Sequence, residues 1–457
     1  MQRHARSSCR TNLASLAVAL ATLAVPAGLP AGVWNGDVNG NGSRGIDDAI
    51  CLLGYLFQHG TPPASLAVDP GVPTTGQTQF WGTLGQIQMP APGEPFHGQD
   101  ATYGSGIAGD FEVIAPDPGD KSTWYTVDHS TGLMWQYIND GQRRTWPEAF
   151  AYASALRLGG FDDWRVPNVT ELVSLIRYDR GQPAFDTDAF GFVIQEPWYH
   201  TFTTSTTPAA NRSECFVVSV KLGAIYFSPK DPGYKPEYVR CVRTIRESGP
   251  NGDVNGDRRV DLSDAISLLL YLFRDGEPPV LYSGARGLPV TYHCCVVDDD
   301  PPCVPEPGEP ECLIQTASDR EGVPRDFELV KPDPADETTW YTIDHAVGLM
   351  WQYAEPLEMK TWEDALAYCE ALQLGPYDDW RLPTVKELQS TINYGKAYPA
   401  VDREYFGTKS YALEGRDNWQ FWSSTAWYTV DVDIGLIADL SPTSSYWVRA
   451  VRSVTPE

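Results

Sequence analysis

Two long segments of the chain repeat each other at a constant offset of 216 residues. The sequence Asn-Gly-Asp-Val-Asn-Gly begins at Asn35 and again at Asn251, and the offset then holds without a gap to Leu172 and Leu388. The matching aromatic motifs lie at 132–137 with 348–353 and at 162–165 with 378–381. Solenoid repeats have periods of about 20 to 50 residues. This chain is therefore expected to contain a duplicated unit of two modules.

The N-terminal segment 1–31 is predicted to be a signal peptide. Basic residues from Arg3 to Arg10 precede an apolar run over 13–24, and cleavage is expected after Ala27 or Ala31. No later stretch reaches the roughly 18 apolar residues that a membrane helix requires. We therefore expect a protein that a bacterium secretes and that has no membrane span.

The charge balance limits the class of partner. The chain carries 60 acidic and 34 basic side chains, a net charge of −26. A nucleic-acid partner is not expected, because a phosphate-binding surface needs a basic patch. Calcium suits this composition, because its ligands are carboxylates and carbonyls. Export also permits disulfides, although spacing leaves open the pairing of Cys294, Cys295, Cys303 and Cys312.

Each copy begins with a short module, 35–63 or 251–279, whose loop carries oxygen-bearing side chains at alternate positions. A calcium ion needs about six to eight oxygens converging on one point, and a loop of this spacing supplies them. Apolar residues at helical spacing then predict an amphipathic helix after each loop. The predicted metal ligands are Asp37, Asn39, Asn41, Ser43 and Asp48 in the first loop, and Asp253, Asn255, Asp257, Arg259 and Asp264 in the second.

These short modules resemble type I dockerin repeats, which are EF-hand-like, because Asp ends each loop and no helix precedes it. The resemblance covers about 35–60 and 251–276. It implies a Ca²⁺ cofactor and allows a cohesin-like protein partner. Dockerin repeats normally stand in tandem, whereas these two lie far apart in the sequence. Two arrangements are therefore open: the helices pair across the molecule, or each packs on its neighbouring domain.

The long modules, 70–246 and 285–457, show helix starts followed by alternating strands. Capping boxes, in which two side chains bond each other's backbone N–H groups, are predicted at 145–148, 168–171 and 384–387. Alternating apolar residues predict strands at 216–220, 238–243 and 446–452. Two short helices with several strands and long Gly/Pro-rich loops indicate an α+β domain.

Four motifs make the long modules resemble the Lcl C-terminal domain family. They are Gly-Leu-Met-Trp-Gln, Thr-Trp-(x)2-Ala-(x)2-Tyr, Asp-Asp-Trp-Arg followed by Leu or Val and Pro, and Phe-Trp-Ser-Ser-Thr. The stretch 380–388 also resembles the formylglycine-generating enzyme superfamily. That resemblance implies two C-type-lectin-like mixed domains, each preceded by an EF-hand-like loop and helix. The Lcl resemblance implies adhesion to glycosaminoglycans.

Aromatic side chains in loops are the candidate contacts for a glycan, because their faces suit sugar rings. The candidates are Trp198, Tyr199, Trp419 and Trp422. Residues 124–246 carry 13 acidic and 13 basic side chains, whereas 340–457 carry 17 and 9. The second copy would repel a sulfated polyanion. The charge therefore favours an extracellular neutral polysaccharide or a protein as the partner.

A disulfide between Cys215 and Cys241 is expected in the first copy. Both cysteines lie on predicted strands, and in the second copy Trp427 and Ala450 replace them together. A bonded pair would be lost together in this way. Cys369 has no clear partner.

The sequence favours a binding protein over an enzyme. His129 and His345 are expected to make structural hydrogen bonds, and Arg165 and Arg381 to be buried structural partners. Asp162-Asp163 and Asp378-Asp379 could act as an acid/base pair, but adjacent side chains usually point apart. No nucleophile elbow, metalloprotease helix or phosphate loop occurs. The function expected is calcium-binding adhesion or carbohydrate recognition, and the alternative is a cohesin-bound subunit of a polysaccharide-degrading assembly.

We predict that the second calcium loop binds more tightly than the first. It offers three ligand carboxylates, Asp253, Asp257 and Asp264, against two in the first loop, and more ligand charge raises calcium affinity. Calorimetric titration of the isolated modules measures the difference. Equal or reversed affinities would contradict the prediction.

Overall fold

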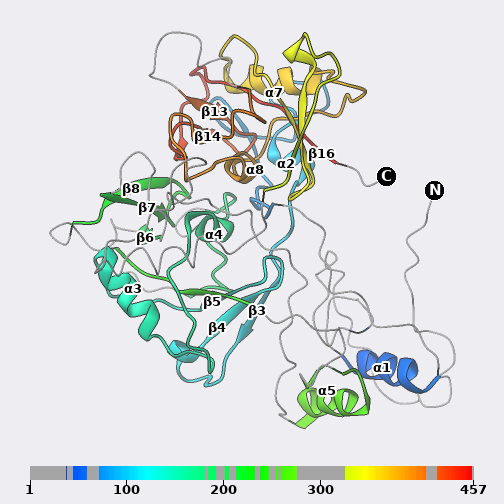
Figure 1. Cartoon of the computed structure of the whole chain (residues 1–457), viewed down its shortest axis with the longest axis vertical. Helices are drawn as coiled ribbons and strands as arrows, with labels where there is room; N and C mark the ends of the chain where they lie inside the picture. The colour runs from blue at the N-terminus through cyan, green and yellow to red at the C-terminus, as the bar shows by residue number, and fades with distance from the viewer. Residues whose placement is uncertain are drawn as a thin grey trace. The chain divides into compact units, whose positions relative to one another are not determined.

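The computed structural model of the chain describes residues 38, 45–58, 72–180, 184–191, 201–204, 213–231, 237–245, 254–255, 259–274, 325–407 and 419–454. These residues divide into two compact units (Figure 1). One holds the helices of both short modules, with 128–133 and 244–245, and the other holds most of the two long modules. Helices and strands both occur throughout, so the predicted α+β class is confirmed.

The first unit is built on two helices, α1 (Ile46–Gln58) and α5 (Leu262–Arg274). They lie side by side and pack against each other (Figure 1). Leu52 of α1 is buried with Ala265 of α5, and Ala49 of α1 with Leu268 of α5. Ala49 is equivalent to Ala265 and Leu52 to Leu268, so the two contacts are counterparts of each other in the two repeats. The sequence left two arrangements open, and the structure shows the one in which the two helices pair with each other.

Each long module contains a four-stranded and a three-stranded sheet in the same order. In the first, β3 (Phe111–Ile114), β4 (Tyr125–Asp128), β5 (Leu133–Gln136) and β9 (Val242–Thr244) form one sheet, and β6 (Thr201–Thr203), β7 (Glu214–Ser219) and β8 (Ile225–Pro229) the other. In the second, these are β10 (Phe327–Val330), β11 (Tyr341–Asp344), β12 (Leu349–Gln352) and β16 (Val451–Ser453), and β13 (Gln420–Trp422), β14 (Tyr428–Asp431) and β15 (Ile437–Asp439).

Two helices occur at equivalent positions in both modules. They are α3 (Trp146–Ala155) and α4 (Val169–Ser174) in the first module, and α7 (Trp362–Ala371) and α8 (Val385–Ser390) in the second. Of these, α3, α4 and α8 begin at the predicted starts. The three predicted capping boxes are confirmed at α3, α4 and α8. These boxes satisfy backbone N–H groups that a helix start leaves without partners.

A buried ion pair fixes α8 to the strand region before it. Both guanidinium ends of Arg381 donate to the carboxylate of Glu387, at 2.8 and 2.6 Å. Glu387 also accepts from the backbone N–H of Thr384 at 2.8 Å, so one carboxylate serves the ion pair and the helix cap. Arg165 and Glu171 repeat this pair in the first module. The structural role expected for both arginines is confirmed.

Residues 72–107, at the start of the first long module, contact the second. This segment includes β1 (Phe80–Gly82), β2 (Gly85–Ile87) and α2 (Asp100–Tyr103). Thr425 of the second module donates to Asp100 at 2.8 Å, and the rings of Trp81 and Trp427 meet edge to face at 5.5 Å. Lys386 on α8 donates to the carbonyls of Thr74 at 2.9 Å and Ser174 at 2.8 Å.

The expected disulfide between Cys215 and Cys241 is wrong. Both are buried free thiols, as is Cys369. Cys215 lies on β7 in the three-stranded sheet, where its sulfur is 3.7 Å from the hydroxyl of Thr203. Cys241 precedes β9 and bonds through its backbone to Gln136 in the four-stranded sheet. The two sulfurs thus belong to separate sheets. Cys51 of α1, in contrast, is disulfide-bonded.

We predict that Glu387→Gln destabilises the second module by about 3–5 kcal/mol, because it leaves the buried charge of Arg381 without its partner. Replacing the pair together, as Arg381→Met with Glu387→Leu, should cost less than the single change. Denaturant unfolding followed by tryptophan fluorescence measures both, with the exposed Glu404→Gln as the control. A Glu387→Gln variant as stable as that control would contradict this account.

Candidate functional site

The calcium ligands predicted from the sequence are described only in part. Asp48, Asn255, Arg259 and Asp264 are among the described residues. The other six, Asp37, Asn39, Asn41, Ser43, Asp253 and Asp257, lie outside them. Within the described part of the chain, no group of three or more His, Cys, Asp or Glu side chains could hold a metal. The calcium site therefore stays a prediction.

The two described carboxylates at the twelfth loop position share one geometry. Asp264 is fully buried and accepts from the backbone N–H groups of Asn255 at 3.1 Å and Asp261 at 2.8 Å. Asp48 is equally buried and accepts from the N–H of Gly45 at 2.7 Å. Each carboxylate holds its loop against the start of its helix. Buried anionic oxygens in this position fit a hard cation.

Of the four aromatic residues predicted to contact a glycan, two are among the described residues and two are not. Trp198 and Tyr199 lie outside the described residues. Trp419 and Trp422 are buried, so their expected exposure is wrong. Trp422 ends β13 and belongs to the hydrophobic core of the second module, where its indole N–H donates to the carbonyl of Lys360 at 2.8 Å. Strand pairing places its ring inward.

The Asp-Asp and Asp-His motifs have structural partners. Asp163 pairs with Arg243, and Asp379 pairs with Arg452, each at 2.6 Å. His345 lies 3.0 Å from the carboxylate of Glu328 at the surface. The structural hydrogen bond expected for His345 is therefore confirmed.

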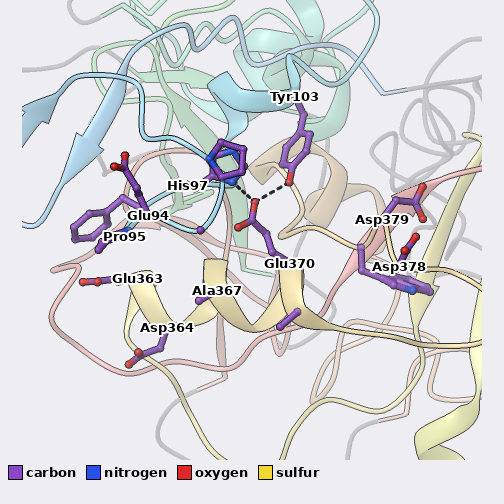
Figure 2. Close-up of a pocket in the computed structure, with 15 residues that line it drawn as sticks. Glu94, Pro95, His97, Tyr103, Glu363, Asp364, Ala367, Glu370, Asp378 and Asp379 are labelled. Carbon is purple, nitrogen blue, oxygen red and sulfur yellow. Dashed lines mark hydrogen bonds and ion pairs between the residues drawn. The ribbon is translucent and has the colours of Figure 1, made fainter.

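A pocket of about 680 Å³ opens in the second unit, where the loop 92–97 and Tyr103 face α7 and the residues 378–380 (Figure 2). Its apolar surfaces come from Phe96, Ala367, Ala371 and Trp380. Its volume lies in the range of about 300–1,000 Å³ typical of small-molecule sites. The acidic side chains that line it are Glu94, Glu363, Asp364, Glu370, Asp378 and Asp379.

Glu370 stands at the centre of this pocket. It extends from α7 to meet His97 and Tyr103, which both contact the same carboxylate oxygen, the phenol at 3.0 Å (Figure 2). Burial and then the charge of Glu370 raise the pKa of Tyr103, so the phenol keeps its proton and donates a hydrogen bond to the carboxylate. Gly98 adopts a φ of +82°, and a side-chain carbon there would lie 2.7 Å from Glu370. A glycine is thus needed for this approach.

A buried glutamine holds the pocket loop in place. Gln99 is fully buried, and its amide donates to the carbonyls of Trp81 and Phe96, both at 2.8 Å. Its carbonyl accepts from the N–H of Trp81 at 2.9 Å. The ring of Phe96 packs 6.0 Å from that of Trp362 on α7. The loop is therefore fixed by hydrogen bonds and packing on both sides.

The first module lacks two of the equivalent carboxylates. By the constant offset, Glu370 corresponds to Ser154 and Glu363 to Pro147, whereas Asp378 and Trp380 correspond to Asp162 and Trp164. The sequence offered no signal for the pocket, because His97 and Glu370 are 273 residues apart. Only the difference between the copies at these two positions could have indicated it.

Comparison with known proteins points to one family. The model of the Lcl C-terminal domain matches residues 125–243 and 341–452, one segment in each long module. A search of curated proteins found no match. Among the described residues, no helix is long and apolar enough to cross a membrane.

We predict that Asp100→Asn gains stability relative to the native chain as the pH rises from 4 to 7. Burial raises the pKa of Asp100 to about 6, despite hydrogen bonds from Thr75 and Thr425 that lower it. The folded state therefore holds a proton that the unfolded chain releases near pH 4, so this group lowers stability as the pH passes from 4 to 6. Two pKa units correspond to a change of about 3 kcal/mol at most in the free energy of unfolding.

Denaturant midpoints at pH 4, 5, 6 and 7 measure this difference. Asp379→Asn is the matched opposite, because the hydrogen bond from Arg452 lowers the pKa of Asp379. The stability that Asp379 contributes is lost only as the pH falls below about 4, so the difference between that variant and the native chain should stay nearly constant from pH 5 to 7. A constant difference between Asp100→Asn and the native chain over this range would contradict the burial argument.

Proposed function

We propose that this chain, which belongs to the Lcl C-terminal domain family, is a secreted, non-catalytic, calcium-binding protein that recognises extracellular carbohydrate. The observation that carries the proposal is the pocket on the second Lcl C-terminal domain. It combines the half-buried ring of Phe96 with carboxylates that can accept hydrogen bonds from sugar hydroxyls. The C-type-lectin-like fold expected from the sequence is part of this proposal.

The charged groups of the pocket favour binding over catalysis. Asp379 is paired with Arg452, and the carboxylate of Asp364 accepts from the hydroxyl of Thr361 at 2.6 Å. Glu370 accepts from the phenol of Tyr103. These groups are held by structural partners, and a set of fixed acceptors is what recognition of a polyol requires.

The paired helices supply the calcium-binding part of the proposal. Asp48 and Asp264 each close a loop whose remaining predicted ligands precede the helix. Calcium bound there would stabilise the helix pair by mass action. Secretion agrees with the predicted signal peptide, and the disulfide at Cys51 suits an oxidising compartment.

A second function, attachment to a cohesin-like protein, is favoured by the outer faces of α1 and α5. Each helix buries one apolar stripe and exposes another along its length, with Phe57 64% and Phe273 59% exposed. Contiguous apolar surface of this kind marks a protein contact. The exposed apolar residues are Ile46, Ile50, Tyr55 and Phe57 on α1, and Leu262, Ile266, Leu270 and Phe273 on α5.

A glycan array probed with the mature chain, in calcium and in chelator, tests the two functions together with a pull-down of cohesin-like proteins. We expect glycan binding that survives the chelator, because the pocket uses residues of the Lcl C-terminal domain. Binding of Phe57→Ala with Phe273→Ala should equal that of the native chain on the array. Calcium-dependent capture of a cohesin that is lost in that double variant, with no glycan binding, would contradict carbohydrate recognition. It would support attachment to a cohesin-like protein as the function.

A further inference from the structure

The pocket at Glu370 has an unusual balance of charge. Fifteen residues line it, and six of them are acidic, whereas none is lysine or arginine (Figure 2). Among the described residues, two of the six have a basic partner: Asp379 pairs with Arg452, and Glu370 contacts His97. His97 is the single basic side chain in the lining. The pocket is therefore electrostatically complementary to a cationic ligand.

The shape and the apolar surfaces indicate that this cation is carried on a larger body. The half-buried ring of Phe96 and the exposed methyl groups of Ala367 and Ala371 give the pocket apolar surface. A volume of about 680 Å³ exceeds what a bare metal ion would occupy. Rings with one apolar face and several polar groups fit such a mixed lining.

Glu370 is positioned to receive a positively charged group. One of its oxygens, Oε1, contacts both His97 and Tyr103, and within the described part of the chain neither of these hydrogen bonds involves Oε2 (Figure 2). The close approach of Gly98 and the buried Gln99 hold the loop opposite it. An acceptor fixed before binding loses little conformational entropy when the ligand arrives. An ammonium group has three N–H donors for this carboxylate and its neighbours.

We propose that this pocket binds an amino sugar that carries a free ammonium group, as in a glucosamine oligosaccharide. The inference rests on the proposed carbohydrate recognition and names its substrate class. The ammonium binds the carboxylate of Glu370, the other acidic side chains of the lining add electrostatic attraction, and the apolar face of a sugar ring packs on Phe96. The first module, with Ser154 and Pro147 at the equivalent positions, does not bind this ligand.

Calorimetric titration of the mature chain in calcium at pH 6 tests the proposal. The probes are tetramers of glucosamine, of N-acetylglucosamine and of glucose. We expect the glucosamine tetramer to bind at least about tenfold more tightly than either neutral tetramer, because a charge-assisted hydrogen bond is worth about 1.5–3 kcal/mol. Its affinity should fall as salt is added.

Variants separate the pocket from general attraction between a cation and an acidic protein. Glu370→Gln should lose about tenfold or more in affinity, and Glu363→Gln should lose affinity without breaking a hydrogen bond that holds the loop. Ser154→Gln, at the equivalent position of the first module, should bind as the native chain does. Thermal melts establish that each variant is folded. If Glu370→Gln does not fold, Glu363→Gln still tests the proposal.

The outcomes distinguish this inference from the proposed function. Equal binding of all three tetramers, or selective binding that Glu370→Gln and Glu363→Gln leave unchanged, overturns the amino-sugar site but keeps carbohydrate recognition. Binding of the neutral tetramers alone does the same. Failure of every tetramer together with an empty glycan array overturns both.

Discussion

The buried pair of arginine and glutamate is the interaction on which the arrangement of each Lcl C-terminal domain depends. The backbone of Arg381 bridges to Val451 of β16, while its side chain reaches Glu387 on α8. One residue thus joins the four-stranded sheet to the helix. Burial would raise the pKa of Glu387, but the charge and hydrogen bonds of Arg381 outweigh it and lower that pKa. The carboxylate stays ionised, and both partners of the pair keep their charge.

From this anchor, contacts extend to the segment that shapes the pocket. Lys386, one residue before Glu387 on α8, reaches the carbonyl of Thr74. Thr425, whose hydroxyl accepts from the N–H of Val385, donates to Asp100 on α2. The same helix α2 ends at Tyr103, which contacts Glu370. A segment from the start of the first copy is in this way built into a site on the second copy, so duplication produced two domains with different surfaces.

Local features of the sequence predicted much of this fold, and long-range packing accounts for what they missed. Capping boxes depend on residues three apart, so the sequence predicted them. Arg165 and Arg381 were expected to be structural, but their partners six positions later, Glu171 and Glu387, were not predicted. The inward direction of Trp422 depends on pairing between β13 and β14, which sequence alone does not specify. Joint replacement of Cys215 and Cys241 suggested a disulfide, but two buried thiols in separate sheets can also change independently. The pocket joins segments too distant in sequence for any local pattern to reveal.

The central claim is that two loop-helix repeats, far apart in sequence, form one calcium module because α1 and α5 pack together. A calcium titration of the mature chain by calorimetry, with thermal melts in calcium and in chelator, tests it most directly. The account predicts saturable binding of about two ions and a higher melting temperature in calcium. No binding and no shift in melting temperature would contradict it, and would leave the two Lcl C-terminal domains alone to explain the function.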